Sequence, residues 1–285
     1  MLKEYSVGYN TVISENTSIG KNVQFGNNCI IEENVVIGDN CYIDSNTIIR
    51  RDTKLGNNVF IASNCIIGEY QMDFITCREY VKHDLLIGDN SIIRSNSVIY
   101  NGSVIGSDLQ TGHHVTIREN SKIGSNVSIG TLSDIQGHCT IGNYVRLHSN
   151  VHIGQSSIID DCCWIYPYVV LTNDPTPPSE TEKGSHIHSF AVVATNSIVL
   201  PGIDIQRDSL IGAGTIVTKD VERYQVVVGN PSKVIGDIRE IKNRETGRKY
   251  YPWRYNFDRA MPWKNFGFDS WYETLDTEMK AMLLG

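Results

Sequence analysis

An apolar residue returns at every sixth position through most of this 285-residue chain. The repeat forms three runs of 10, 15 and 6 hexads, whose first positions span residues 13–67, 87–171 and 187–217. The first position is Ile, Leu, Val or Phe in every hexad except the one that begins at Thr111. An amphipathic helix needs a period of about 3.6 residues, so this pattern excludes a helical fold for these runs. A short fixed period predicts a solenoid.

Two further positions of the hexad are restricted. The fourth is usually Asn, Asp or Gly, which tolerate the left-handed backbone conformation that a sharp corner requires. The fifth is usually a small residue, and five of the seven cysteines occupy it: Cys29, Cys41, Cys65, Cys139 and Cys163. One large and one small inward residue suit a short flat strand that ends in a tight turn. Because the chain has no Cys-x-x-Cys pair, we expect the cysteines to be buried thiols.

This pattern resembles the hexapeptide repeat of left-handed parallel β-helix proteins over roughly residues 13–221. Three hexads make one triangular coil of 18 residues, so the repeat predicts an all-β solenoid of about ten coils. At about 4.8 Å between strands, the solenoid is about 48 Å long. The left hand is implied by the resemblance, since ordinary parallel crossovers have the opposite hand.

The repeat is interrupted twice, by insertions of 14 residues before Ile87 and 10 residues before Ile187. We expect loops at residues 68–86 and 173–186. The interruptions lie 15 hexads apart, a multiple of three, so both loops should leave the same edge. They are then separated by five coils, or about 24 Å. Loops on a rigid scaffold often carry function, which favours an enzyme over a structural scaffold.

The chain divides into a β-helix domain at residues 1–235 and a C-terminal extension at residues 236–285. Residues 236–249 have mixed charge and are expected to be helical. Residues 250–285 contain ten of the 25 aromatic residues. Such a tail is expected to pack on its own scaffold or on a neighbouring subunit.

Composition excludes several classes of partner. The chain has 25 Lys and Arg against 32 Asp and Glu, a net charge of −7, and no basic block, which argues against nucleic acid. The longest apolar run is Cys162–Tyr166, far below the roughly 18 residues of a membrane helix. Residues 1–10 have no apolar signal core. We therefore expect a cytoplasmic protein without membrane insertion.

Polar residues gather on the edge that carries the loops. Residues 18 apart should lie above one another, which stacks Gln155 and Asn173 at the mouth of the second loop. Asp174 follows in that loop, and His138 occupies the same edge one coil earlier than Ser156. A polar pair beside a proline-stiffened loop suits the binding of hydroxyls or an amine. A solvated corner is the alternative, because Asn and Asp are common in turns.

Histidines supply the candidates for a general base. Asp134 should lie one coil from His152 and could orient its imidazole, although such a pair can also serve stability alone. His148 is an equal candidate. Weaker candidates are His113, His114, His186 and His188. No set of three histidines recurs with consistent coil spacing, so the sequence predicts no metal site.

The last coils are rich in small residues. Ala194 and Gly212 should be stacked, and residues 211–215 are nearly bare of side chains. Small residues expose backbone groups to a long, thin ligand, and Lys219 and Lys233 could meet its phosphates. Structural glycines at corners are the alternative.

Residues 209–233 resemble the C-terminal end of hexapeptide acyltransferases, in which pantetheine lies along small residues between two subunits of a trimer. The resemblance implies a homotrimer that uses acyl-CoA as cosubstrate and has no tightly bound cofactor. The residues that it assigns to acyl-CoA are Ala194, Gly212, Ala213, Gly214, Lys219 and Lys233.

Residues 148–178 more specifically resemble N-acyltransferases that modify nucleotide-linked amino sugars, especially dTDP-3-amino-3,6-dideoxyhexoses. The matching motifs are Asn150-Val151-His152-Ile153-Gly154 and Leu171-Thr172-Asn173-Asp174-Pro175. In such relatives an acidic residue and an asparagine, one coil apart, approach the sugar. Asn173 matches the asparagine, but Gln155 stands where the acid is expected. The substrate-binding candidates are Asn150, Gln155, Asn173, Asp174 and His138.

The sequence thus predicts acyl transfer from acyl-CoA to the C3 amine of a dTDP-linked 3-amino-3,6-dideoxyhexose, for O-antigen, capsule or S-layer glycans. The amine would attack the thioester directly, with His148, or His152 with Asp134, as a reserve base. A UDP-linked amino sugar, a hydroxyl acceptor and a non-catalytic scaffold stay open as alternatives. The acyl chain, acetyl or longer, and the gluco or galacto configuration are also open.

Overall fold

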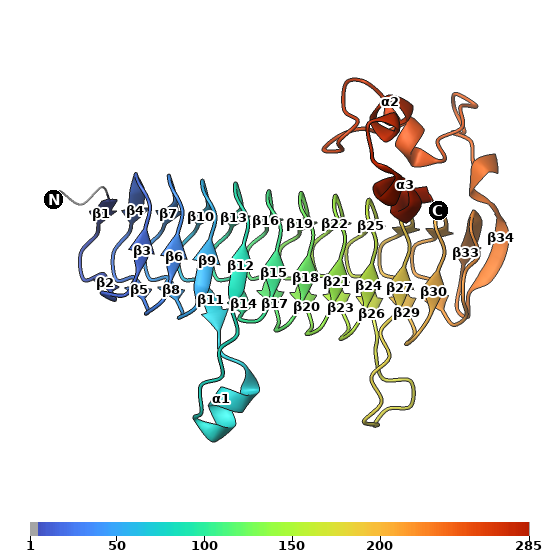
Figure 1. Ribbon diagram of the computed structural model, residues 1–285. Coiled ribbons are helices and arrows are strands. Elements are labelled where there is room, and N and C mark those ends of the chain that lie inside the picture. Colours follow the sequence, from blue (N-terminus) through green and yellow to red (C-terminus); the bar gives the residue numbers. More distant parts are fainter. Residues whose placement is uncertain (1–4, 285) are drawn as a thin grey trace.

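The computed structural model describes residues 5–284, so residues 1–4 and 285 of the expected domains lie outside it. Within this range the chain winds into a parallel β-solenoid with three faces (Figure 1). Each face is one sheet, and we call the 13-, 11- and 10-stranded sheets A, B and C. The chain visits them in that order, coil after coil, as the hexad repeat predicts.

The strands are short, and most contain two residues. Sheet A contains β1 (Tyr5–Val7), β4 (Val23–Phe25), β7 (Tyr42–Ile43), β10 (Phe60–Ile61), β13 (Ile92–Ile93), β16 (Gln110–Thr111), β19 (Ser128–Ile129), β22 (Arg146–Leu147), β25 (Trp164–Ile165), β28 (Val192–Val193), β31 (Leu210–Ile211), β33 (Gln225–Val228) and β34 (Lys233–Asp237). Sheet B contains β2 (Val12–Ile13), β5 (Ile30–Ile31), β8 (Ile48–Ile49), β11 (Ile66–Glu69), β14 (Val98–Tyr100), β17 (Thr116–Ile117), β20 (Asp134–Ile135), β23 (His152–Ile153), β26 (Val170–Leu171), β29 (Ile198–Val199) and β32 (Ile216–Val217). Sheet C contains β3 (Ser18–Ile19), β6 (Val36–Ile37), β9 (Thr53–Leu55), β12 (Leu85–Ile87), β15 (Val104–Ile105), β18 (Lys122–Ile123), β21 (Thr140–Ile141), β24 (Ile158–Ile159), β27 (His186–Ile187) and β30 (Asp204–Ile205).

The register confirms that residues 18 apart are vertical neighbours. Asp134 pairs with His152, for example, and Ile135 pairs with Ile153. The large residue at the first hexad position points inward and is buried in nearly every coil. The small fifth-position residues, including the five cysteines named above, are buried beside it. A continuous core therefore runs along the solenoid axis.

Corners of the solenoid use the left-handed backbone conformation at the fourth hexad position. Asn40 has a φ of 58°, and most of its counterparts in other coils have similar values. The amides also form ladders: Asn22 Nδ2 donates to Asn40 Oδ1 over 3.1 Å. Asn suits this position because its short polar side chain tolerates the conformation better than other non-glycine residues.

Replacing Asn40 by Ala is expected to destabilise the protein by about 1–2 kcal/mol, because Ala retains the steric cost of a left-handed residue. Asn40→Gly is the matched control and should be much closer to wild type, since glycine has no Cβ. Urea unfolding of the two variants measures the difference. Equal midpoints for Ala and Gly would contradict a conformational role for this corner.

Both loops leave the edge between sheets B and C, as expected. The first joins β11 to β12 and contains helix α1 (Met72–Cys77), and the second joins β26 to β27. Figure 1 shows both loops on the same side of the solenoid, with the C-terminal tail on the other side. Five strand-to-strand steps in sheet B separate them, which confirms the predicted spacing.

The C-terminal segment differs in part from the expectation. Residues 236–249 were expected to be helical, but strand β34 forms an antiparallel hairpin with β33, and the 3₁₀ turn η1 (Ile238–Glu240) follows. Backbone pairing with the last strand of sheet A outweighs the helix propensity of this charged segment. Further 3₁₀ and helical turns are η2 (Trp253–Tyr255), α2 (Phe268–Glu273) and α3 (Thr277–Leu284).

The aromatic tail packs on its own solenoid. A second core joins buried scaffold residues to buried tail residues, and its members are Cys162, Phe190, Val192, Trp253, Met261, Trp263, Phe268 and Leu283. The Trp253 indole donates to the carbonyl oxygen of Phe190 over 2.9 Å. The tail is thus held against sheet A and its corners. Among residues 5–284, the helices are too short or too polar to cross a membrane.

Candidate active site

A groove of about 580 Å³ lies where the tail meets the outer surface of sheet A. Its floor consists of outward-facing residues that pair in register from one coil to the next, namely Gln110, Ser128, Arg146 and Trp164. The corner after sheet A contributes Gly130 and His148, and the tail contributes residues 259–262. The site is therefore built from the regular repeat on one side and the irregular tail on the other.

His148 has the environment of a proton acceptor. Its ring stacks on Tyr166, with centroids 4.7 Å apart and an interplanar angle of 12°. Burial, and then the positive charge of Arg259, lower the pKa of His148 below its ordinary value. The lowered pKa favours the neutral imidazole, the form that can accept a proton from a reacting group.

Arg146 places a buried guanidinium in the floor of the groove. The residue is 8% exposed. It donates to Asn126 Oδ1 over 2.6 Å and to the backbone carbonyl oxygens of Asn126 and Ala260. It therefore joins two coils to the tail and also brings positive charge to a site that could hold an anion.

An aromatic pocket of about 250 Å³ lies beside the groove. The two share Trp164, and the remaining lining residues are Tyr166, Val192, Tyr250, Tyr251, Trp253, Asn256 and Phe257. Among the described residues, the buried indole nitrogen of Trp164 has no hydrogen-bond partner. Since buried polar groups are normally paired, this buried N–H is an exception.

Toward the end of the solenoid, the corner that carries His148 continues with Tyr166 and then with the small residues Ala194 and Gly212. Backbone hydrogen bonds connect it without a break, from Tyr166 N to Val193 O and from Ala194 N to Ile211 O. Gly212 follows, and a Cβ there would meet Val228 Cγ1 at 2.6 Å, so this glycine is needed for packing. Gly214 has a φ of 69° and open space around it. The small residues Ala194, Gly212, Ala213 and Gly214 thus lie in the coils beyond Tyr166. Lys219 follows β32, Lys233 begins β34, and both are exposed.

The predicted pairing of Asp134 with His152 is present on the face of sheet B. His152 Nδ1 lies 3.1 Å from Asp134 Oδ2, and Gln136 Nε2 donates to the same oxygen over 2.5 Å. Burial raises the pKa of Asp134, but the hydrogen bonds from His152 and Gln136 outweigh it and lower the pKa. The Asp134 carboxylate contacts His152, whereas His148 lies in the groove. The two histidines therefore belong to separate environments.

The remaining sugar-binding candidates lie on two edges. Asn150 is a left-handed corner with a φ of 58°, two residues after His148. Gln155 and the left-handed corner His138 lie on the edge between sheets B and C. Asn173 lies on that edge too, over Gly154, and its carbonyl oxygen accepts from Lys183 N at the base of the loop.

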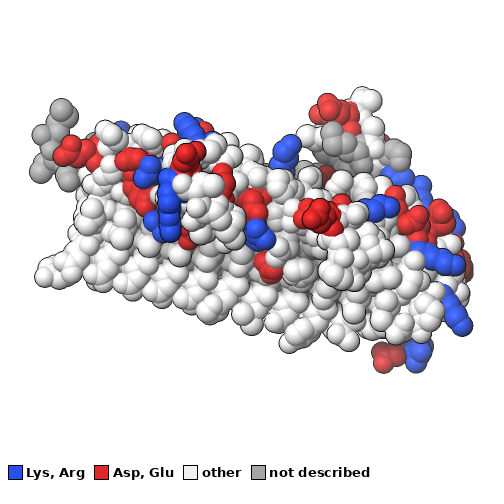
Figure 2. Space-filling view, turned by 90° about the horizontal axis from the view of Figure 1, so that it is seen from below, with Lys and Arg blue, Asp and Glu red and all other residues white. Residues whose placement is uncertain are grey.

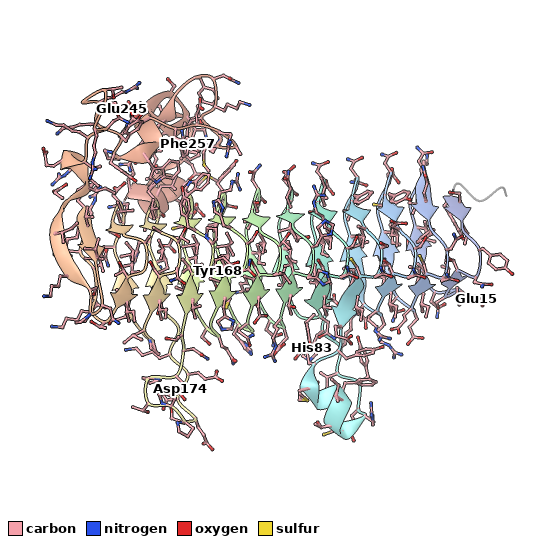
Figure 3. All side chains as sticks on the ribbon, turned by 180° about the vertical axis from the view of Figure 1, so that it is seen from behind. Glu15, His83, Tyr168, Asp174, Glu245 and Phe257 are labelled. Atoms are coloured by element: carbon pink, nitrogen blue, oxygen red, sulfur yellow. The ribbon has the colours of Figure 1, made fainter. Side chains whose placement is uncertain are left out.

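Asp174 organises the second loop. Its carboxylate accepts from Ser179 Oγ over 2.6 Å, from Ser179 N over 2.9 Å and from Thr176 N over 3.0 Å. These hydrogen bonds, first of all the one from the Ser179 hydroxyl, lower its pKa. Figure 3 labels Asp174 on the loop side of the solenoid and Phe257 on the tail side. Within one chain, the structure brings Asn150 near His148 and leaves Gln155, Asn173, Asp174 and His138 on the other edge.

Several residues of the groove were missed by sequence reasoning. Arg146 and Trp164 occupy outward strand positions, where the repeat allows any residue. Arg259 comes from the irregular tail, and no periodicity connects it with His148. A bulky Trp and an Arg in successive coils of one face were the signal that could have indicated a covered surface.

Comparison with known protein families identifies the repeat. The model described as bacterial transferase hexapeptide (six repeats) matches residues 10–40, 34–69 and 120–155. The hexapeptide repeat of succinyl-transferase matches residues 195–219. These segments of the chain therefore carry the hexapeptide repeat that the two models describe.

Curated relatives match over short segments. A Staphylococcus aureus (strain COL) protein named for a suspected acetyltransferase activity is 45% identical over 53 residues, which are 19% of this chain and 27% of the relative. Escherichia coli (strain K12) galactoside O-acetyltransferase is 37% identical over 79 residues, 25% of this chain and 36% of the relative. The chain thus spans about a third or less of the length of these relatives.

A solved structure agrees with the architecture. Francisella novicida UDP-N-acetylglucosamine acyltransferase superposes with a TM-score of 0.50 and 23% identity, and the match covers 81% of this chain and 70% of the other. At this identity the likeness concerns the fold.

Proposed function

We propose that the protein transfers an acyl group from acyl-CoA to an amine in the groove at His148. The observation that carries this proposal is the half-buried His148, which has a lowered pKa and stacks on Tyr166, the residue that separates it from the small residues Ala194 and Gly212 in the following coils. Its support from relatives is the acetyltransferase activity that their names state. Pantetheine would lie along Ala194, Gly212 and Gly214, which leaves the thioester near His148. Lys219 or Lys233 would meet the CoA phosphates.

In the proposed reaction the uncharged amine attacks the thioester carbon, and a C–N bond forms while the C–S bond breaks. The nitrogen loses a proton to His148. His148 then gives this proton to the departing CoA sulfur. Atoms and charge balance, because the products are an amide and free CoA thiol. Holding the amine near the carbonyl in a water-poor groove supplies much of the acceleration. The pair of His152 and Asp134 is disfavoured as the base, because it lies on the face of sheet B and the groove lies on sheet A.

For the acceptor we propose a dTDP-linked 3-amino-3,6-dideoxyhexose, destined for O-antigen, capsule or S-layer glycans. The support is the resemblance of residues 148–178 to enzymes with such substrates. Asn150 is near enough to the groove to contact the sugar. The aromatic pocket beside Trp164 fits the size and flat shape of a nucleobase. Both substrates occur in the cytoplasm, where we place the reaction.

A homotrimer would complete this site. Gln155 and Asn173 lie on the loop edge of the chain, and in an assembly of parallel solenoids that edge can face the groove of a neighbour. Figure 2 shows a broad band along the solenoid that is largely free of charged side chains. Such a band suits a subunit interface. The mass in solution, measured by light scattering, should be three times that of the chain.

The test of the proposed function is a thiol-release assay with acetyl-CoA and a panel of acceptors. The panel contains dTDP-linked 3-amino and 4-amino sugars, a UDP-linked amino sugar and the matching hydroxyl sugars. We expect the fastest CoA release with a dTDP-linked 3-amino sugar, and an acetylated product by mass spectrometry. No release with any acceptor would overturn the enzyme proposal.

A hydroxyl acceptor is the second candidate function, and the match with galactoside O-acetyltransferase favours it. A hydroxyl is a poor nucleophile until it loses its proton, so this reaction would depend more strongly on His148. The same panel separates the two candidates. Faster release with the hydroxyl sugars than with their amino counterparts would support O-acylation.

Arg259 provides a test of how His148 is tuned. Because its positive charge lowers the pKa of His148, the Arg259→Gln variant should raise that pKa. The acid limb of the pH profile of kcat/KM should then move to higher pH, so activity is lost earlier as pH falls. Lys264→Gln, which removes an exposed tail cation, is the control. An unmoved acid limb in Arg259→Gln would show that His148 does not set it.

A further inference from the structure

A cluster of histidines and carboxylates lies on sheet C, away from the groove. Asp160 directly follows β24, His186 lies in β27 and His188 follows that strand. Each offers one ligand atom, and the three atoms lie within 4.8 Å of one another. No metal site was expected from the sequence, because the inserted loop hides this column: Ile158 pairs with His186, and Asp160 therefore with His188, at a spacing of 28 residues instead of 18.

The carboxylate of Asp160 is shared between the two imidazoles. Its Oδ1 lies 3.0 Å from His186 Nε2, and its Oδ2 lies 3.3 Å from His188 Nδ1. A tetrahedral zinc ion with bonds of about 2.0–2.2 Å keeps its ligand atoms about 3.3 Å apart. These two separations, each to a different oxygen of the carboxylate, are close to those of a loaded site, and the three ligand atoms all lie within 4.8 Å of one another.

His188 also contacts a second carboxylate on its other side. Its Nε2 lies 2.6 Å from Asp204 Oδ1 in β30, and Gln206 Nε2 donates to that same oxygen over 3.1 Å. A neutral imidazole has a single N–H, so it can satisfy only one of two facing carboxylates. A cation on the Nδ1 side resolves the conflict: Nδ1 binds the ion while Nε2–H donates to Asp204. Carboxylates hold metal-binding histidines in this way.

The charges favour a dication over two protons. Two carboxylates, Asp160 and Asp204, face two imidazoles whose rings are stacked with centroids 3.8 Å apart. Protonating both stacked rings would place like charges in contact. One divalent ion neutralises both carboxylates and leaves both rings neutral.

We propose that Asp160, His186 and His188 bind one divalent transition metal ion, with Zn²⁺ as the best match, and that Asp204 orients His188. Two imidazole nitrogens and one carboxylate oxygen, with a water as fourth ligand, are a donor set that zinc accepts. The ion would join β24 to β27 directly after the second loop, and Asp204 would extend the link to β30. It would thereby fasten the base of that loop to the solenoid.

Cobalt titration tests the site without reference to enzyme activity. Tag-free protein is stripped with a chelator and titrated with Co²⁺, and the visible ligand-field bands are followed; Zn²⁺ is then added in competition. We expect one Co²⁺ per chain, displaced by Zn²⁺, without a thiolate charge-transfer band from the exposed Cys77. Absence of saturable Co²⁺ binding would overturn the proposal.

Variants locate the ion. His188→Ala and Asp160→Ala should abolish the bands, and Asp204→Asn should weaken Co²⁺ affinity by about 10- to 100-fold. His152→Gln is the matched control, because His152 also pairs with a carboxylate at 3.1 Å but, among residues 5–284, has no third ligand beside it. It should bind Co²⁺ like wild type. Bands that survive in His188→Ala or vanish in His152→Gln would contradict the assignment. Thermal melting in chelator verifies that each variant is folded.

Discussion

Replacement of His148 by Gln is expected to lower kcat/KM by about 10²- to 10⁴-fold, the usual contribution of a positioned general base. Gln keeps a polar side chain of similar length that can still lie on Tyr166, but it cannot accept a proton at neutral pH. The loss should appear mainly in kcat, because the variant removes a step of the chemistry and leaves the groove in place. Thiol release under saturating acyl-CoA measures it.

Two comparisons make this result specific. His113→Gln changes an exposed histidine outside the groove and should retain wild-type rates. His152→Gln tests the other candidate base and should cost far less than His148→Gln. A loss in His152→Gln that equals or exceeds the loss in His148→Gln would move the chemistry to sheet B. Equal rates in wild type and His148→Gln would favour direct attack without a protein base.

Replacement of Asp208 by Asn is expected to destabilise the docked tail by about 3–5 kcal/mol, since it leaves a buried charge without its partner. The Asp208 and Arg254 side chains are 1% and 4% exposed, and they form an ion pair. The Arg254 guanidinium also lies 4.6 Å from the centre of the Phe190 ring. Asp208 has a φ of 60°, which Asn tolerates, so the substitution removes charge without straining the backbone.

The consequence should reach the groove, because residues 259–262 form one of its sides. We expect Asp208→Asn to expose the tail to limited proteolysis and to reduce acyl transfer, while the solenoid stays folded by circular dichroism. Arg223→Gln is the control: its side chain is 40% exposed and lies 3.4 Å from Asp208, so its removal should cost less than about 1 kcal/mol. A protease-resistant tail in Asp208→Asn would contradict the role of this pair.

The solenoid could be predicted because each hexad repeats the same pattern of inward-facing and corner residues. Ile135 and Ile153 stack since both occupy the same inward position, and the same arithmetic places Asp134 beside His152. The common edge of the two loops follows from counting hexads. Any feature that depends only on coil register was therefore within reach of the sequence.

Features that depend on irregular segments could not be predicted from the sequence. The tail reaches sheet A through side-chain packing of Trp253 and Trp263 on Phe190, which has no period to count. The groove, which Arg146 and Ala260 both line, could therefore not be predicted from the sequence. The cluster of Asp160, His186 and His188 on sheet C could not be predicted for a related reason. The second loop lies between Asp160 and the two histidines in the sequence, so their spacing departs from 18 residues.

The central claim is that acyl transfer takes place in the groove at His148. A crystal structure with CoA and a dTDP-linked 3-amino sugar tests it most directly. We predict pantetheine along Ala194 and Gly212, with the sugar amine about 3–3.5 Å from the position of the thioester carbon and in hydrogen-bond reach of His148. Pantetheine bound on another edge, or an amine that His148 cannot reach, would contradict the claim.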